Sequence, residues 1–225
     1  MDSNDLAELA QQLGRPQGEL GLRVAQAMQV SNARMHDRSH AALELSADMH
    51  VVEVGPGSGM LSEPVVRCLG AQGRYTALEY SRDMADLAAT RLQGLSAAPV
   101  SIHCVDVSDP NLQVPVAAGS VDRLLAVNVV YFIDDLDSFL GRVAAWLRPG
   151  GMCVLGVRSR EVLCQLPFTR FGFRIRSLDT YLTALGRAGF REIAAFYEDE
   201  GPTDFDGMQF SLDAVVVRAT RSRSG

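Results

Sequence analysis

The chain has 225 residues, of which 47% are hydrophobic, and a formal net charge of −6 from 27 acidic and 21 basic residues. This size predicts one α/β domain with a modest attachment, and the acidic balance argues against a nucleic-acid partner, because phosphate binding needs a basic surface. No apolar run is long enough to span a bilayer, and the acidic start is unlike a secretory signal, so we expect a cytoplasmic protein without integral membrane contact.

The first 45 residues predict helices that precede the main domain. Leucines recur on one helical face over 6–13, Arg15–Gly18 interrupts them, and a second apolar stripe runs over 20–32. We expect residues 1–45 to form a helical attachment, which either packs along the flank of the domain or covers one edge of it as a lid.

Short β-rich runs alternate with helical patterns over residues 46–218, which is typical of a mostly parallel sheet covered on both faces. Several runs are almost wholly apolar, as in strands buried on both sides. The predicted strands are His50–Val54, Arg74–Glu79, Val100–Val105, Val121–Asn128, Met152–Arg158, Glu192–Tyr197 and Met208–Val217. The predicted helices are Leu61–Gly70, Asp83–Gln93, Asp135–Leu147 and Leu178–Arg187. Between them we expect an irregular segment over Ser159–Ser177, and residues 219–225 are expected to be a frayed tail.

The four cysteines are scattered along the chain. Cys68, Cys104, Cys153 and Cys164 form no C-x-x-C pair, and the histidines supply no spacing typical of metal ligands. We expect buried thiols, with neither a disulfide nor a metal site.

A glycine-rich turn, Gly55-Pro56-Gly57-Ser58-Gly59, follows the first predicted strand directly. Ligands of open α/β sheets bind beyond the carboxyl ends of the strands, and glycine lets a ligand approach the main chain closely. The dinucleotide fingerprint G-x-G-x-x-G fails here, because Met60 stands in place of the third glycine. The turn therefore favours a nucleoside that carries an amino-acid arm over a dinucleotide.

Acidic residues stand at the ends of the first three predicted strands. Glu79 ends the second strand, where one carboxylate can accept hydrogen bonds from both hydroxyls of a ribose. Asp106 ends the third strand, where it can accept from an exocyclic adenine amine while a neighbouring N–H donates to a ring nitrogen. Together with Glu53, these residues are expected to line one edge of the sheet.

This ordered set of motifs resembles the class I S-adenosylmethionine-dependent methyltransferases over roughly residues 45–218. Val51–Gly59 is similar to the first motif of that family, and Ala77–Ser81 to its ribose motif. His103–Val107 is similar to the adenine motif, and Asp122–Asn128 resembles the fourth motif.

The resemblance implies a doubly wound, mostly parallel seven-stranded sheet in the order 3-2-1-4-5-7-6 with one antiparallel strand, and S-adenosylmethionine as the cofactor. It implies that Gly55 and Gly57 approach the methionyl arm, that Met84 covers the adenine, and that Asn128-Val129 faces the transferred methyl group. The cofactor-binding residues expected on this basis are Glu53, Gly55, Pro56, Gly57, Gly59, Glu79, Tyr80, Met84, Asp106, Val107, Asn128 and Val129.

Two residues are candidates for work on the methyl acceptor. His36 lies in the helical attachment and is a candidate base, although an exposed helical histidine is the simpler interpretation. Tyr131 follows the fourth strand and is a candidate for orienting the acceptor, or it packs in the core. Transfer from a sulfonium is largely a matter of positioning, and a base is needed only where the acceptor must lose a proton.

Arginines and phenylalanines are interleaved after the fifth predicted strand. They are Arg158, Arg160, Phe168, Arg170, Phe171, Phe173, Arg174 and Arg176. This segment predicts a wall for an acidic or aromatic acceptor, a contact with an anionic membrane surface, or a solvated lid anchored by its aromatic rings.

These features predict an S-adenosylmethionine-dependent methyltransferase that acts on a small-molecule acceptor by in-line displacement. The fourth motif, Asn128-Val129-Val130-Tyr131, lacks the prolines of an N-P-P-Y motif, which disfavours methylation of adenine or glutamine nitrogens. A nicotinamide-dependent oxidoreductase is a second reading, weakened by the missing third glycine and by the lack of a Tyr-x-x-x-Lys pair. A non-catalytic nucleoside-binding module on the same fold is a third.

Overall fold

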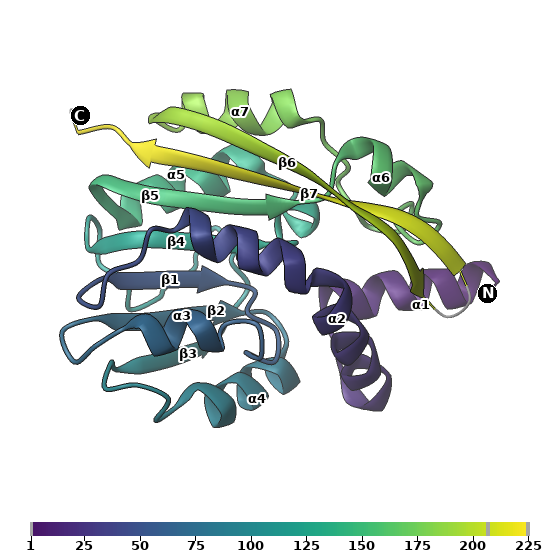
Figure 1. The fold of residues 1–225 in the computed structure, drawn as a ribbon, viewed down its shortest axis with the longest axis horizontal. Coiled ribbons are helices and arrows are strands. Elements are labelled where there is room, and N and C mark those ends of the chain that lie inside the picture. Colours follow the sequence, from purple (N-terminus) through teal and green to yellow (C-terminus); the bar gives the residue numbers. More distant parts are fainter. Residues whose placement is uncertain (1, 206–207, 224–225) are drawn as a thin grey trace.

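A seven-stranded sheet runs through the molecule in a computed structural model that describes residues 2–205 and 208–223 (Figure 1). The strand order is β3-β2-β1-β4-β5-β7-β6. β7 runs antiparallel to both of its neighbours, whereas β1 to β5 pair in parallel. The predicted order and the single antiparallel strand are confirmed. The strands are β1 (His50–Val54), β2 (Arg74–Glu79), β3 (Val100–Cys104), β4 (Val121–Val127), β5 (Leu147–Val157), β6 (Phe190–Phe205) and β7 (Met208–Arg221).

The last two strands form a hairpin much longer than the sequence predicts. β6 was expected to end at Tyr197, but it continues to Phe205 because it keeps pairing with β7 through Phe205 and Met208. Gly201-Pro202, which resembles a strand break in the sequence, is accommodated by a shift in register after Asp199. β7 continues to Arg221, three residues into the expected tail 219–225, of which residues 224–225 lie outside the described part of the chain.

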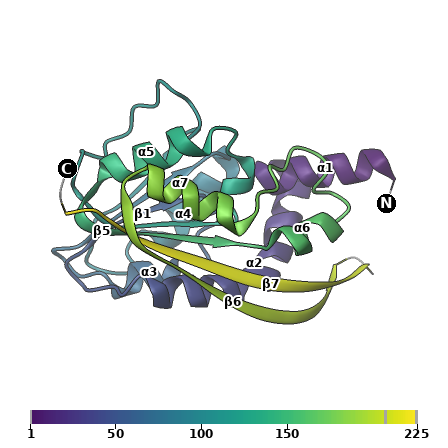
Figure 2. The same ribbon diagram turned by 90° about the horizontal axis from the view of Figure 1, so that it is seen from above.

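Helices cover both faces of the sheet (Figure 2). They are α1 (Ser3–Gly14), α2 (Gly18–Ala42), α3 (Glu63–Cys68), α4 (Arg82–Leu92), α5 (Leu136–Trp146), α6 (Arg160–Gln165) and α7 (Leu178–Arg187), with a 3-10 turn η1 (Val130–Phe132). Side-chain oxygens cap several of them, as Ser81 does when it accepts from the Met84 N–H at the start of α4. None of the helices in the described residues is long and apolar enough to cross a membrane.

Two helices differ from the sequence prediction. α2 continues to Ala42 instead of ending near residue 32, because Met35, His36 and Ser39 extend the face that it buries. The segment after β5 was expected to be irregular, but it contains α6, which Ser159 caps by accepting from the Val162 N–H.

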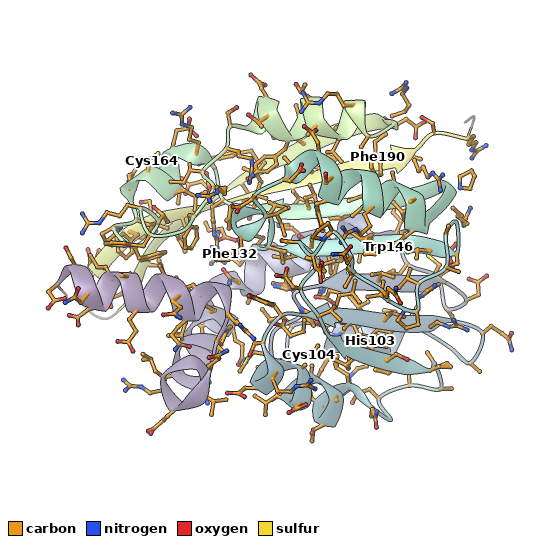
Figure 3. The ribbon with its side chains drawn as sticks, turned by 180° about the vertical axis from the view of Figure 1, so that it is seen from behind. His103, Cys104, Phe132, Trp146, Cys164 and Phe190 are labelled. Carbon is orange, nitrogen blue, oxygen red and sulfur yellow. The ribbon has the colours of Figure 1, made fainter. Side chains whose placement is uncertain are left out.

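The apolar core has two parts, one on each face of the sheet. One part brings together Met35 of α2, residues 65–66 of α3 and Leu92 of α4. The other holds Trp146 and Phe190 against α5 and α7 (Figure 3). This two-sided burial explains why several of the strand sequences are almost wholly apolar.

The four cysteines are free thiols, but they are not all buried. Cys153 lies in the core and Cys104 is half-buried, whereas Cys68 and Cys164 are exposed near the ends of the short helices α3 and α6. The expectation of four buried thiols is therefore wrong for these two positions.

Candidate functional site

The carboxyl ends of the central strands meet at one edge of the sheet, next to α1 and α2 (Figure 1). Val54 of β1 is in register with Leu78 of β2 and Ala126 of β4, so the residues that follow these strands lie close together. A cavity of about 1620 Å³ opens at this edge, lined by the glycine-rich turn, by Glu79 and Asn128, and by residues of α1 and α2. α1 and part of α2 thus lie over the carboxyl edge of the sheet, whereas Met35 in the second half of α2 packs in the core on one face of it.

The three glycines of the turn all have positive φ, at 69° for Gly55, 57° for Gly57 and 78° for Gly59. A Cβ atom at Gly55 would lie 2.6 Å from Cγ2 of Val129, and one at Gly59 would lie 3.0 Å from Cγ of Leu92. At Gly57, by contrast, no atom of the described residues lies within 4 Å of that position. Packing thus demands glycine at 55 and 59, while Gly57 leaves the main chain open toward the cavity.

Glu79 is buried at the end of β2 and aims its carboxylate at this turn. Its Oε2 accepts from the Gly57 N–H at 2.9 Å, and its Oε1 accepts from the Ser81 N–H at 2.8 Å. Burial raises the pKa of Glu79, and these two N–H groups partly offset the rise. Each oxygen keeps a lone pair beyond the one already used, so the carboxylate can still accept from two hydroxyls of a ligand.

Glu53 does not join the cavity, although the sequence groups it with Glu79. Its side chain is 1% exposed, and its Oε2 accepts from the Tyr75 hydroxyl at 2.7 Å. Burial raises the pKa of Glu53 to about 7. Glu53 thus lies behind the turn that holds Gly55 and Gly57, and it is not among the residues that line the cavity.

The adenine end predicted from β3 lies on the cavity wall. Tyr80, Met84, Asp106 and Val107 all line it. Met84 is fully buried in the first turn of α4, and Asp106 is exposed, with its Oδ1 accepting from the Ser108 N–H at 2.8 Å. Of the other expected cofactor residues, Pro56, Asn128 and Val129 also line the cavity.

Asn128, directly after β4, has the left-handed backbone (φ 56°) that side chains rarely adopt. Its N–H donates to the Gly156 carbonyl at 2.8 Å, and its Oδ1 accepts from the Tyr131 hydroxyl at 3.2 Å. The same hydroxyl accepts from the backbone N–H of Arg158. Burial raises the pKa of Tyr131 far above its ordinary value, so it stays protonated and bonded at the site edge.

His36 lies on the face of α2 that crosses the carboxyl ends of β4 and β5. It lines the cavity, is only 7% exposed, and its Nδ1 has no hydrogen-bond partner among the described residues. Burial, followed by the proximity of His40 and Arg158, lowers the pKa of His36 to about 3. The exposed histidine considered from the sequence is therefore wrong, and the imidazole is neutral and weakly basic.

The turn between α1 and α2 is bonded to the start of α4, next to Glu79. The Gly18 N–H donates to Oδ2 of Asp83 at 2.7 Å, and the Ser81 hydroxyl donates to the Pro16 carbonyl. The Arg15 guanidinium lies 4.3 Å from the centre of the Tyr80 ring. The sequence marks 15–18 only as a helix break, and no pattern in it indicated these long-range contacts.

Arg158 is the functional residue whose role sequence reasoning missed. Its buried guanidinium pairs with Glu200 of β6 and donates to the Asp213 carbonyl of β7. It also donates to the Ser31 carbonyl at 2.9 Å and to Oδ1 of Asn32 at 3.1 Å, both on α2. Arg158 thus joins the helical attachment to the long hairpin.

The remaining arginines of residues 158–176 do not line this cavity. Arg174 donates to Oδ1 of Asp134 at 2.6 Å, and Arg176 donates to the carbonyls of Val130 and Ile133 at 2.8 and 2.6 Å. These bonds attach the segment to residues 130–134. They favour the interpretation of the segment as an anchored lid over that of a basic membrane-contact surface.

Comparison with known proteins agrees with this geometry. Residues 52–153 match the family model described as a methyltransferase domain. Residues 52–153 are thus similar to a methyltransferase domain, and the strand order is the one implied by the resemblance to class I S-adenosylmethionine-dependent methyltransferases. The turn, Glu79 and the end of β4 all lie within the matched segment.

Relatives and solved structures extend the comparison. A ubiquinone biosynthesis O-methyltransferase of Nitrobacter winogradskyi is 31% identical over 129 residues, which is 57% of this chain and 46% of that protein. The chain spans about half the length of the curated relatives it matches. A Haloferax volcanii putative methyltransferase, solved in complex with the Trm112 activator, covers 89% of this chain and 94% of its own at a TM-score of 0.72 and 19% identity. A phosphoethanolamine N-methyltransferase of Haemonchus contortus, solved with S-adenosylmethionine, covers 83% of this chain and 52% of its own at a TM-score of 0.61 and 12% identity.

The residues present fit the cofactor of this class. The open main chain at Gly57 offers the close approach that a methionyl arm needs, and the Glu79 carboxylate lies directly beside it. Met84 and Val107 supply apolar surface at the adenine end, where Asp106 adds a carboxylate. The nicotinamide reading is disfavoured by these comparisons and by the absence of a third glycine at Met60.

Proposed function

We propose that the protein transfers the methyl group of S-adenosylmethionine to an oxygen of a small molecule that binds beneath α1 and α2. The observation that carries this proposal is the cavity of about 1620 Å³, which extends from the glycine-rich turn to the helical attachment. A pocket for one small ligand commonly occupies about 300–1,000 Å³. The cavity therefore has room for a cofactor and a second molecule.

The curated relatives are named O-methyltransferases, which supports oxygen as the accepting atom. When bound, S-adenosylmethionine would supply a methyl carbon on a positively charged sulfur: the acceptor oxygen would bond to this carbon as the C–S bond breaks, S-adenosylhomocysteine would leave, and the hydroxyl proton would pass to solvent. The residues of this chain bind and orient. Glu79 would hold the ribose hydroxyls, Gly57 would accommodate the methionyl arm, and Asp106 with Val107 would meet the adenine.

The acceptor side of the site is built for positioning. α1 and α2 cover the cavity and limit the access of water, and Tyr131 fixes the side-chain amide of Asn128 at the edge of it. His36 suits orientation of an acceptor hydroxyl better than removal of its proton, because a group with a pKa near 3 is a weak base at neutral pH.

Calorimetric titration with S-adenosylmethionine and with NAD tests the cofactor, and transfer of a labelled methyl group to matched phenols and anilines tests the acceptor atom. We expect binding of S-adenosylmethionine alone and transfer to phenols. Binding of NAD in its place would support an oxidoreductase and refute the proposal. Binding without any transfer to the panel would favour the non-catalytic module, and preferred transfer to anilines would refute oxygen as the acceptor.

A further inference from the structure

Aromatic rings gather on the wall of the cavity away from the glycine-rich turn. We name the set Phe132, Phe168, Phe171, Phe173 and Phe210 the aromatic chamber; all five line the cavity. The ring centres of Phe132 and Phe173 are 4.7 Å apart, and those of Phe168 and Phe173 are 5.9 Å apart. Phe132 lies beside the end of α1, where a Cβ atom at Gly14 would come within 3.0 Å of its ring (Figure 3).

The long β6–β7 hairpin supplies one side of this chamber. β5 pairs with β7 only as far as Val215, and beyond that point β6 and β7 pair with each other alone. This free part of the hairpin projects past the sheet on the same side as α1 (Figures 1 and 2). It contributes Phe210 and Leu212 to the cavity wall.

The hairpin is fixed to the helical attachment by ion pairs and hydrogen bonds. Arg38 of α2 pairs with Glu198, and Arg34 donates to the Glu200 carbonyl at 3.0 Å. Arg158 joins both elements, as described above. The hairpin side of the chamber is therefore held in place by α2.

The charge that residues 158–176 present to the cavity is already matched, whereas Arg15 and Arg23, which also line the cavity, stand on the turn before α2 and on α2. Arg158 is the arginine of residues 158–176 that lines the cavity, and Glu200 neutralises it. A carboxylate or phosphate buried against the rings would lose its hydration without gaining an unmatched cation from this segment, which is costly. An uncharged ring would instead stack on rings, as the aromatic residues do with each other.

We propose that the aromatic chamber takes an uncharged, ring-bearing acceptor and excludes acidic ones. This proposal rests on the proposed function, because it concerns the acceptor half of the same cavity. It chooses between the acidic and the aromatic acceptor that the sequence left open, and it makes Phe168 and Phe210 residues that determine specificity.

The test is binding of three probes that share one ring system, measured by calorimetry on the full chain saturated with S-adenosylhomocysteine. The probes are 2-naphthol, 2-naphthoate and 2-naphthylmethylamine. We expect 2-naphthol to bind at least tenfold more tightly than either charged probe. Equal or tighter binding of the carboxylate or of the amine would overturn the proposal.

Alanine variants of the chamber show where the ring of 2-naphthol binds. Phe168→Ala and Phe210→Ala should each weaken 2-naphthol binding about fivefold or more. Phe196→Ala is the matched control, because Phe196 lies on the same hairpin with 53% of its surface exposed and does not line the cavity; it should change binding less than twofold. Unchanged binding in folded Phe210→Ala and Phe168→Ala proteins would overturn the proposal. Failure to bind S-adenosylhomocysteine would instead refute the proposed function, so the two failures are distinguishable.

Discussion

The Tyr131 hydroxyl donates to the side-chain oxygen of Asn128 at 3.2 Å, and it accepts from the backbone N–H of Arg158. One buried phenol thus connects the end of β4 with the end of β5. Because Asn128 Oδ1 is held toward Tyr131, the amide orientation of Asn128 is fixed at the cavity edge. Tyr131 therefore acts as a positioning residue.

Tyr131→Phe keeps the ring and removes the hydroxyl, so Asn128 and the Arg158 N–H each lose a partner. Loss of a buried hydrogen bond commonly costs about 1–3 kcal/mol. We expect kcat to fall about tenfold or more, while the Kd for S-adenosylmethionine changes less than threefold. Steady-state kinetics and calorimetry measure the two effects separately.

The control for this variant is Tyr181→Phe. Tyr181 is equally buried, but it lies on α7 near Arg176 and does not line the cavity. This variant should leave kcat within twofold of the wild type. If both variants reduce kcat alike, or if Tyr131→Phe acts only on cofactor affinity, the positioning role is wrong.

Glu79→Ala removes the carboxylate that meets both the Gly57 and Ser81 N–H groups. We expect binding of S-adenosylmethionine to weaken by about 1–3 kcal/mol, the range for a hydrogen bond to a charged group. Calorimetric titration measures it. Asp86→Ala removes an exposed carboxylate of α4, outside the cavity, and serves as the control; affinity unchanged in Glu79→Ala would contradict the ribose assignment.

Gly57→Ala separates the cost of an unfavourable backbone from the cost of a blocked site. Gly57 and Gly94 both have positive φ, and at both positions a Cβ atom would meet no described atom within 4 Å. Each alanine should therefore cost about 1–2 kcal/mol of folding stability. Only Gly57 lines the cavity, so Gly57→Ala alone should reduce S-adenosylmethionine binding by more than tenfold. Thermal unfolding and calorimetry of the two variants decide this, and equal losses of affinity would show that the turn does not contact the cofactor.

The sequence predicted the sheet well because its strands are buried on both faces. An apolar run such as residues 152–157 of β5 has few other stable placements, and the turn glycines at 55 and 59 are demanded by contacts with nearby elements. The sequence also indicated Glu79 as a candidate binding residue, because a carboxylate at the end of the second strand can accept hydrogen bonds from both hydroxyls of a ribose. These features depend on short-range pattern and strand order.

Long-range contacts could not be predicted in this way. Glu53 and Glu79 have the same residue type and both lie at strand ends, yet Tyr75 holds Glu53 away from the cavity. The length of β6 depends on pairing across the hairpin rather than on its own apolar pattern, which Gly201 interrupts. Arg158 looked like one of several surface arginines, and its partners lie 42 and 55 residues further along the chain.

His36 gives the folded protein a characteristic dependence on pH. Burial lowers its pKa from an ordinary 6.5 to about 3. Between these pH values the imidazole is therefore protonated in the unfolded chain but neutral in the folded chain. Stability should therefore fall as pH falls from 6.5 toward 3. In His36→Gln this contribution is absent, so the stability of the wild type relative to the variant should fall by about 1 kcal/mol between pH 6 and pH 5.

Glu53→Gln provides the opposite sign in the same experiment. Burial raises the pKa of Glu53 from 4.5 to about 7, so the folded chain keeps a proton that the unfolded chain releases, and stability falls as pH rises between these values. The wild type should thus lose stability relative to Glu53→Gln as pH rises from 5 to 7, whereas it should gain relative to His36→Gln over pH 5 to 6. Urea unfolding of the three proteins at pH 5, 6 and 7 measures how each stability difference changes with pH. His36 is still present in Glu53→Gln, and Glu53 is still present in His36→Gln, so the two effects can be separated. A flat difference for His36→Gln would mean that the imidazole takes up its proton at the same pH in the folded and the unfolded chain, which would contradict its lowered pKa.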